Sequence, residues 1–268
     1  MKRIKKHFLI FLRYLKMDIM YDMTSRTNFL IMLGVEVFYT VAFLLFFNVL
    51  YGNIKTLAGW TYYEMLLLLG FDAVMSELLV GFIFANGANA LPKRVLTGYV
   101  DYFLLKPVSS ILFLMVLQPY FPSIFSTGFG FILMGIALSH LTISLSITNI
   151  VGTLIITCCG FLISTCIMIT ISSLAFVFAN AQLLPRIGFM STISFSGRPH
   201  QMYDTLLLKS VFFLILPAVF LSSVPVYSLT HTVSFKLLIL ALTLSCLFVF
   251  LTKKIWDAVI TNYTSASS

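Results

Sequence analysis

Charged residues are scarce in this sequence. Only 10% of its 268 residues are Asp, Glu, Lys or Arg, while 60% are hydrophobic. Soluble domains carry about 25% charged and about 45–50% apolar residues. The composition therefore excludes a soluble globular enzyme, and the long apolar runs exclude a disordered or coiled-coil chain. A polytopic helical membrane protein remains.

Several sequence motifs of enzymes are also missing. No GxxxxGK[ST] phosphate loop occurs, so we expect this chain not to hydrolyse nucleotide itself. The patterns HExxH, CxxC and GxSxG are absent as well, which disfavours a metal site or a serine hydrolase. The four cysteines all lie in apolar runs, and we expect small buried hydrophobes rather than disulfides: Cys158, Cys159, Cys166 and Cys246. We predict a non-enzymatic chain that holds no cofactor or metal of its own.

What is present is apolar sequence in membrane-length runs. A bilayer core of about 30 Å needs about 20 apolar helical residues to cross it. No charged residue occurs from Pro107 to Pro185, and a polar break near 139–146 divides this stretch into two spans. We predict an all-α polytopic membrane protein with six transmembrane helices, at about residues 29–50, 62–84, 110–138, 147–178, 205–229 and 235–251.

The remaining segments are more polar. Over residues 1–28, apolar side chains recur at helical spacing with basic residues mostly off that stripe. This pattern predicts an amphipathic helix at the membrane interface, followed by one six-span transmembrane domain over 29–268. Two polar segments, 86–106 and 180–204, interrupt the spans. We predict that the first is a loop or short helix outside the hydrocarbon, that the second is a loop, and that both lie on the cytoplasmic side.

The basic residues predict the orientation. The chain has 17 Lys and Arg against 9 Asp and Glu. With both termini in the cytoplasm, fifteen basic residues lie inside, and only Lys55 and Lys236 lie outside. Positive charge accumulates on the cytoplasmic side of membrane proteins. We therefore predict both termini inside, and we attribute the basic excess to the membrane rather than to a nucleic-acid partner.

Three acidic residues lie about seven residues or more inside the ends of predicted spans: Glu36, Asp72 and Glu77. Acids inside a membrane are costly and often functional. They could form an ion or substrate site, as in an ion-coupled secondary transporter or a channel. They could equally be polar contacts between helices. The sequence leaves both interpretations open, and it places Glu36 and Glu77 at similar depth.

The first polar segment resembles a known family. Its run TGYVDYFLLKPVS over 97–109 is similar to the TGxLDxxLLxPxS signature of permeases from the second class of ATP-binding-cassette exporters. Val100 stands where that family prefers Leu. Two later stretches agree in order: Pro199 to Tyr203 with the following Ile215-Leu216-Pro217-Ala218, and the tail from Trp256 to Ser268.

The resemblance implies an exporter subunit in the plasma membrane of a prokaryote. Separate ATPase subunits would bind ATP and Mg²⁺, and a second permease chain, identical or related, would complete the transport path. Segment 86–106 would contact the ATPase first and 180–204 second. The residues implicated in coupling are Arg94, Thr97, Gly98, Tyr99, Asp101, Tyr102, Lys106 and Pro107. An intramembrane enzyme and a structural scaffold are further alternatives.

Overall fold

The structure is a computed structural model. It describes residues 26–105, 109–116, 119–120, 122–143, 146–178 and 181–263, together with residues 13, 16, 17 and 20. In this part of the chain the regular structure is helical, with no β-strand and one isolated bridge between Leu57 and Trp60. The all-α prediction is confirmed. The interfacial helix predicted over 1–28 falls largely outside the described residues.

Four of the described helical segments are long and apolar enough to cross a membrane. They are α2 (Arg26–Asn53), α3 (Tyr62–Leu79) with its continuation, α7 (Ile147–Ser173) and α11 (Phe235–Thr261). The continuation of α3 is a π-helix, η1 (Val80–Ala88), and a 3₁₀ turn, η3 (Leu174–Phe176), extends α7. These helices coincide with the predicted first, second, fourth and sixth spans.

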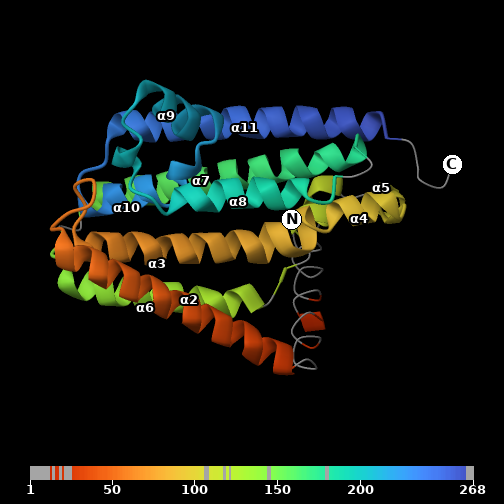
Figure 1. The fold of residues 1–268 in the computed structure, drawn as a ribbon. Helices are drawn as coiled ribbons and strands as arrows, with labels where there is room; N and C mark the ends of the chain where they lie inside the picture. Colours follow the sequence, from red (N-terminus) through yellow and green to blue (C-terminus); the bar gives the residue numbers. More distant parts are fainter. Residues whose placement is uncertain are drawn as a thin grey trace.

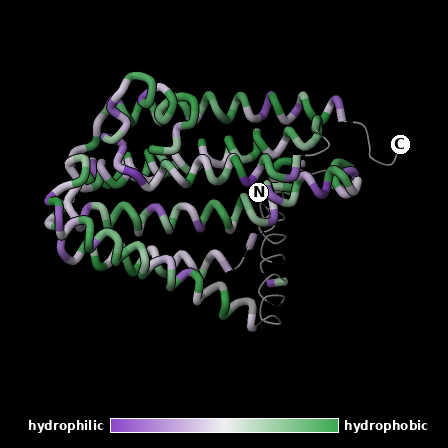
Figure 2. Tube along the Cα trace, viewed as in Figure 1, coloured by the Kyte–Doolittle hydropathy of each residue, from purple (hydrophilic) through white to green (hydrophobic). Residues whose placement is uncertain are grey.

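The helices form layers (Figure 1). Helix α7 lies at the centre, with α11 on one side and α3 on the other, and α2 and α6 (Pro122–His140) lie beyond α3. The closest pairs are α3 with α6 and α7 with α11. Short helices occupy the two ends of the bundle: α4 (Leu91–Leu96) and α5 (Tyr99–Leu104) at one, α9 (Leu206–Ser210) and α10 (Ser223–Thr230) at the other. Apolar residues follow the length of the long helices, and polar ones gather toward their ends (Figure 2).

The predicted third span is interrupted. Its first part is a short π-helix, η2 (Leu112–Val116), and its second part is α6. Pro119 and Pro122 stand at the break, where they cannot donate backbone hydrogen bonds. Helix η1 supplies partners there. The Tyr120 N–H donates to the Gly81 carbonyl at 2.7 Å, and Asn86 Nδ2 donates to the Pro119 carbonyl at 3.2 Å.

The prediction of one fifth span over 205–229 was wrong. That stretch is divided into α9, the π-helix η5 (Val211–Ile215), the 3₁₀ turn η6 (Ala218–Phe220) and α10. Pro217 separates η5 from η6, because its ring removes a backbone donor. The structure also differs from the loop expected over 180–204. That segment contains a 13-residue helix, α8 (Leu184–Ser196), which lies beside α7.

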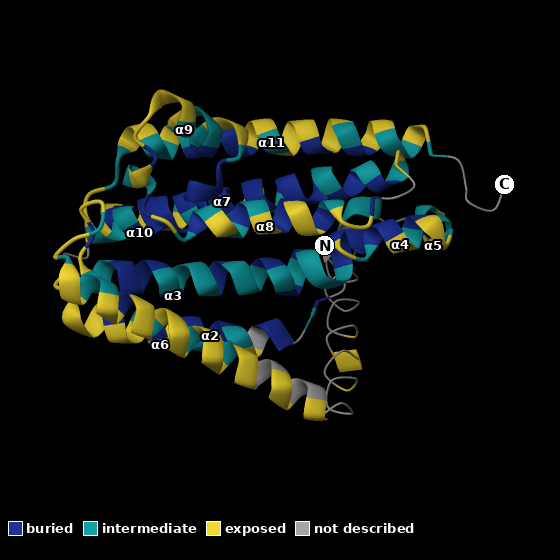
Figure 3. Ribbon diagram, in the orientation of Figure 1, coloured by how far each residue is buried: buried dark blue, intermediate teal, exposed yellow. Residues whose placement is uncertain are grey.

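Burial separates the layers (Figure 3). Helix α7 contains many buried residues, whereas α2 is largely exposed. Small residues on α7 allow close approach: a Cβ added at Gly160 would overlap the Phe220 carbonyl. Small residues allow this kind of close helix packing in membrane proteins. Of the cysteines, Cys159 and Cys166 are buried, but Cys158 and Cys246 are exposed, because the outer surface of a membrane bundle is itself apolar. All four are free thiols.

Candidate functional site

The predicted coupling segment forms two short helices at one end of the bundle. Helix α3 continues through η1 to Ala88, and α4 starts at Leu91 with Pro92 in its first turn. Gly98 then has φ 68° and ψ 5°, and α5 begins directly after it. This left-handed conformation favours glycine, so Gly98 permits the tight turn between α4 and α5.

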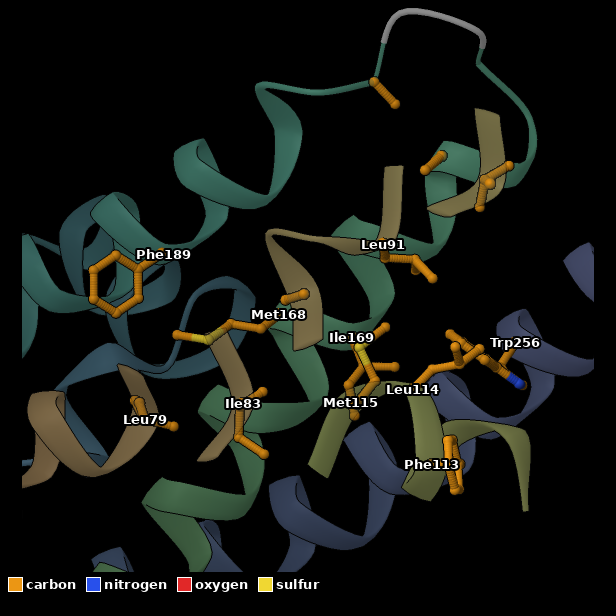
Figure 4. Close-up of a cluster of buried hydrophobic side chains, with 14 of the residues drawn as sticks. Leu79, Ile83, Leu91, Phe113, Leu114, Met115, Met168, Ile169, Phe189 and Trp256 are labelled. Carbon is orange, nitrogen blue, oxygen red and sulfur yellow. The ribbon is translucent and has the colours of Figure 1, made fainter. Parts of the chain in front are cut away.

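One side of this helix pair is anchored in the core. Leu91, Val95, Val100 and Phe103 are buried in one apolar cluster. The same cluster includes Leu114 and Met115 of η2, Met168 and Ile169 of α7, and Trp256 of α11 (Figure 4). The Trp256 Nε1 also donates to Ser110 Oγ at 3.1 Å. Helices α4 and α5 are therefore packed against three other elements, so a force on them reaches the bundle directly.

Two of the predicted coupling residues bind within the chain. Arg94 Nη1 donates to the Leu114 carbonyl of η2 at 3.1 Å. Thr97 Oγ1 donates to the Lys93 carbonyl at 3.0 Å, one turn earlier in α4. These bonds fix α4 against η2 and close its last turn. Arg94 and Thr97 therefore position the segment.

The tip of the segment is exposed and aromatic. Tyr99 is 51% exposed and Tyr102 is 60% exposed, while the neighbouring Phe103 is buried. Both tyrosine rings contact Phe103 edge-on, with centroids 4.9 and 5.4 Å away. Leu96 and Leu105 are also exposed, and Asp101 lies in the first turn of α5. Lys106 and Pro107, the last two predicted residues, lie outside the described part of the chain.

The intramembrane acids lie in two places. Glu36 of α2 and Glu77 of α3 are near enough for their charges to interact, and both are partly buried. Asp72 is separate from them. Its Oδ1 accepts hydrogen bonds from Ser196 Oγ and from Ser222 Oγ, each at 2.6 Å. Among the described residues, no group of three or more His, Cys, Asp or Glu side chains could hold a metal ion.

Comparison with known families decides the identity. A sequence model described as ABC-2 family transporter protein matches residues 37–267. The chain belongs to the ABC-2 transporter family. No curated protein and no solved structure matches it. Family membership makes it a multi-pass membrane protein and a permease of an ATP-binding-cassette transporter, and it implies association with ATPase subunits. It does not favour the ion-coupled alternative.

In this ABC-2 permease the end opposite α4 and α5 carries a polar cluster that sequence reasoning missed. The His200 backbone N–H donates to Ser223 Oγ at 2.8 Å, and its ring packs edge-on against Tyr227. Tyr227 stacks on His231, which lies 3.9 Å from a carboxylate oxygen of Glu64. Burial, with a smaller contribution from His231, lowers the pKa of His200 to about 4. The residues come from α3, η4 (His200–Met202) and α10, so no spacing in the sequence relates them.

A further hydrogen bond fixes this end of the permease. Buried Trp60 donates from Nε1 to Gln201 Oε1 at 2.8 Å, across 141 positions of the sequence. Asn149 Nδ2 donates to the His231 carbonyl at 3.1 Å. The first bond joins the residues before α3 to η4, and the second joins α7 to the residue that follows α10. The residues in each pair are 82 or more positions apart, so no local sequence pattern could have predicted these two hydrogen bonds.

Proposed function

We propose that this chain is the membrane permease of an ABC exporter, and that the exposed tip of α4 and α5 binds its ATPase subunit. The observation that carries the proposal is the combination of an exposed aromatic tip with a base anchored in the core. Since the sequence has no phosphate loop, energy must arrive through a protein contact. The substrate is a molecule that moves out of the cell, and its chemistry stays open.

Six membrane crossings and cytoplasmic termini belong to the same proposal. The crossings would be α2, α3 with η1, η2 with α6, α7, α8 and α11. Because α8 replaces the predicted fifth span, Arg198 and Lys209 move to the side opposite α4 and α5. Thirteen of the 17 basic residues then lie on the side of α4 and α5, and four lie on the other. The asymmetry is smaller than predicted but still supports a cytoplasmic location for this tip.

A second permease chain is part of the proposal. Helix α2 contacts α3 and α6, and most of its surface is exposed. Exposed apolar side chains on it include Phe38, Phe43 and Phe46. Lipid or a second permease can cover such a surface. The complete exporter would then contain two permease chains and two ATPase subunits that bind ATP and Mg²⁺, in the plasma membrane of a prokaryote.

The experiment is co-purification of the ATPase with variants of the tip. Interfaces depend on a few aromatic anchors, whose truncation costs about 2 kcal/mol or more. We expect Tyr99→Ala and Tyr102→Ala to reduce ATPase capture by tenfold or more, on the order set by that energy, and to reduce export in vesicles. Phe250→Ala is the matched control, because Phe250 is 63% exposed on α11, outside both the tip and the α2 surface proposed for the second permease.

The expected pattern is loss of ATPase capture in both tip variants and retention in the control. All three proteins should reach the membrane at wild-type levels. Wild-type capture together with wild-type export in both tip variants would contradict the proposal, and would leave the two tyrosines as anchors at the lipid interface.

A further inference from the structure

One carboxyl group closes the base of a long excursion of the chain. Ser196 is the last residue of α8, and Ser222 precedes the first residue of α10. Between them, residues 197–221 form η4, α9, η5 and η6 at one end of the bundle. Both serine hydroxyls donate to the same oxygen, Oδ1 of Asp72 in α3. The two ends of the excursion are therefore joined to each other and to α3 at one atom.

The surroundings are built around this carboxyl group. The side chains of Ser196 and Ser222 are fully buried, so water cannot replace Asp72 as their acceptor. Gly197 follows Ser196, and a Cβ at that position would lie 2.7 Å from Asp72 Oδ2. A larger residue would push the carboxyl group away. Ser196 Oγ can also donate to the Ile193 carbonyl at 3.1 Å, so the hydroxyl that depends most on Asp72 is that of Ser222. An unpaired hydroxyl buried inside a membrane protein is unfavourable, which favours the arrangement with Asp72 as the acceptor.

The excursion has further attachments away from its base. Gln201 accepts from Trp60, and His200 donates from its backbone to Ser223. The backbone at Phe220 lies directly against Gly160 of α7. The His200–Ser223 bond ties the two ends of the excursion to each other, and the bonds at Asp72 tie both ends to α3. Breaking the bonds at Asp72 would remove the hydrogen bonds that hold the last residue of α8 and the residue before α10 to α3.

We propose that Asp72 is a latch: it is a positioning residue that holds the excursion 197–221 and α10 closed against α3. This inference rests on the proposed function for its role in transport, since the excursion then covers the outer end of the path. Movement of substrate past this end requires both serine–aspartate bonds to break. The latch itself is a property of the permease alone and can be tested without the ATPase.

The test measures how readily α10 leaves α3. Val226 of α10 is fully buried, and its neighbours include residues of α3. In a background without the four native cysteines, Val226→Cys reports opening by its reaction with a polar maleimide in purified, detergent-solubilised permease. We expect Asp72→Leu and Ser222→Ala to raise the labelling rate about tenfold or more, because buried hydrogen bonds are lost. Asp72→Asn keeps an acceptor oxygen and should stay within about threefold of wild type.

Two controls make the test specific. Ser228→Ala also removes a buried hydroxyl from α10, but the Ser228 hydroxyl has no hydrogen-bond partner among the described residues, so labelling should not change. Ile163→Cys in the core of α7 reports general loosening and should stay unreactive in every variant. Wild-type labelling in Asp72→Leu, equal rates in Asp72→Leu and Asp72→Asn, or a parallel rise at position 163 would each overturn the latch. Loss of ATPase binding would not affect any of these results.

Discussion

His200 gives the polar cluster a dependence on pH. Its pKa is lowered to about 4 in the folded protein, mainly by burial, whereas an unfolded histidine has a pKa of about 6.5. Between these two values the unfolded chain binds more protons than the folded one. The contribution of His200 to the free energy of unfolding is therefore complete above pH 6.5 and is lost as the pH falls toward 4.

We expect the melting temperature of the purified permease to fall as the pH is lowered from 7 to 4.5. The His200 contribution should approach about 1.4 kcal/mol per pH unit within this range. His200→Asn removes the titrating ring and should give a flatter profile. The profile of each protein is measured by thermal unfolding in detergent. Parallel profiles for the two proteins would exclude His200 as the source.

Glu36 of α2 and Glu77 of α3 are two further titratable side chains, and they lie close together. We expect Glu36→Gln and Glu77→Gln to retain export and ATPase capture, because an amide still forms a polar helix contact. Stability should change by no more than about 1 kcal/mol. Export measured in vesicles checks this. If either substitution abolished export in a fully assembled complex, the carboxyl group would have to carry a cation instead.

Among elements, the contact between α7 and the excursion 197–221 depends on one glycine. Gly160→Ala would place a Cβ against the Phe220 carbonyl, which is backbone and cannot rotate away. We expect a loss of about 2 kcal/mol of stability, in the range of overpacked cores. Gly135→Ala on α6 is the matched control, since no atom in the described part of the chain lies within 4 Å of its added Cβ. Thermal unfolding of both variants is the measurement, and equal melting temperatures would refute the contact.

The sequence predicted elements whose apolar residues are continuous. Helices α2, α3, α7 and α11 lie where hydropathy placed spans. It failed for α8, which contains Arg186 and several Ser and Thr residues. Thr192 and Ser196 are buried against protein, and their hydroxyls bond to Gly188 and Asp72. A hydropathy profile scores such residues as polar wherever they lie, because a single sequence does not show which faces of a helix pack against other helices.

The candidate sites were predicted unevenly for the same reason. The turn at Gly98 and the exposed Tyr99 and Tyr102 depend on neighbours in the sequence, and they are visible from a local pattern. The partners of Asp72 lie 124 and 150 positions away. Their pairing follows from the tertiary fold. From the sequence, Asp72 could be recognised only as an acidic residue inside a predicted membrane span, where a charge is costly.

For the whole molecule, the proposed topology makes a testable difference between the two ends. Asn53 and Thr261 are exposed and lie at the ends of α2 and α11. In a cysteine-free background, Asn53→Cys should react with an impermeant maleimide on intact cells. Thr261→Cys should react only after lysis. External labelling of Thr261→Cys would contradict cytoplasmic termini.

Residues 62–96 form one almost continuous helical rod from α3 through η1 to α4. At about 1.5 Å per residue its length is roughly 50 Å. Asp72 lies toward one end of this rod, and the tip of α4 and α5 lies at the other. Asp72 and the tip therefore belong to a single, nearly continuous helical stretch of the chain. Under the proposed function, a displacement of the tip by the ATPase would be transmitted along this rod to Asp72, because the buried cluster around Leu91 and Leu114 packs the rod firmly where it meets the tip.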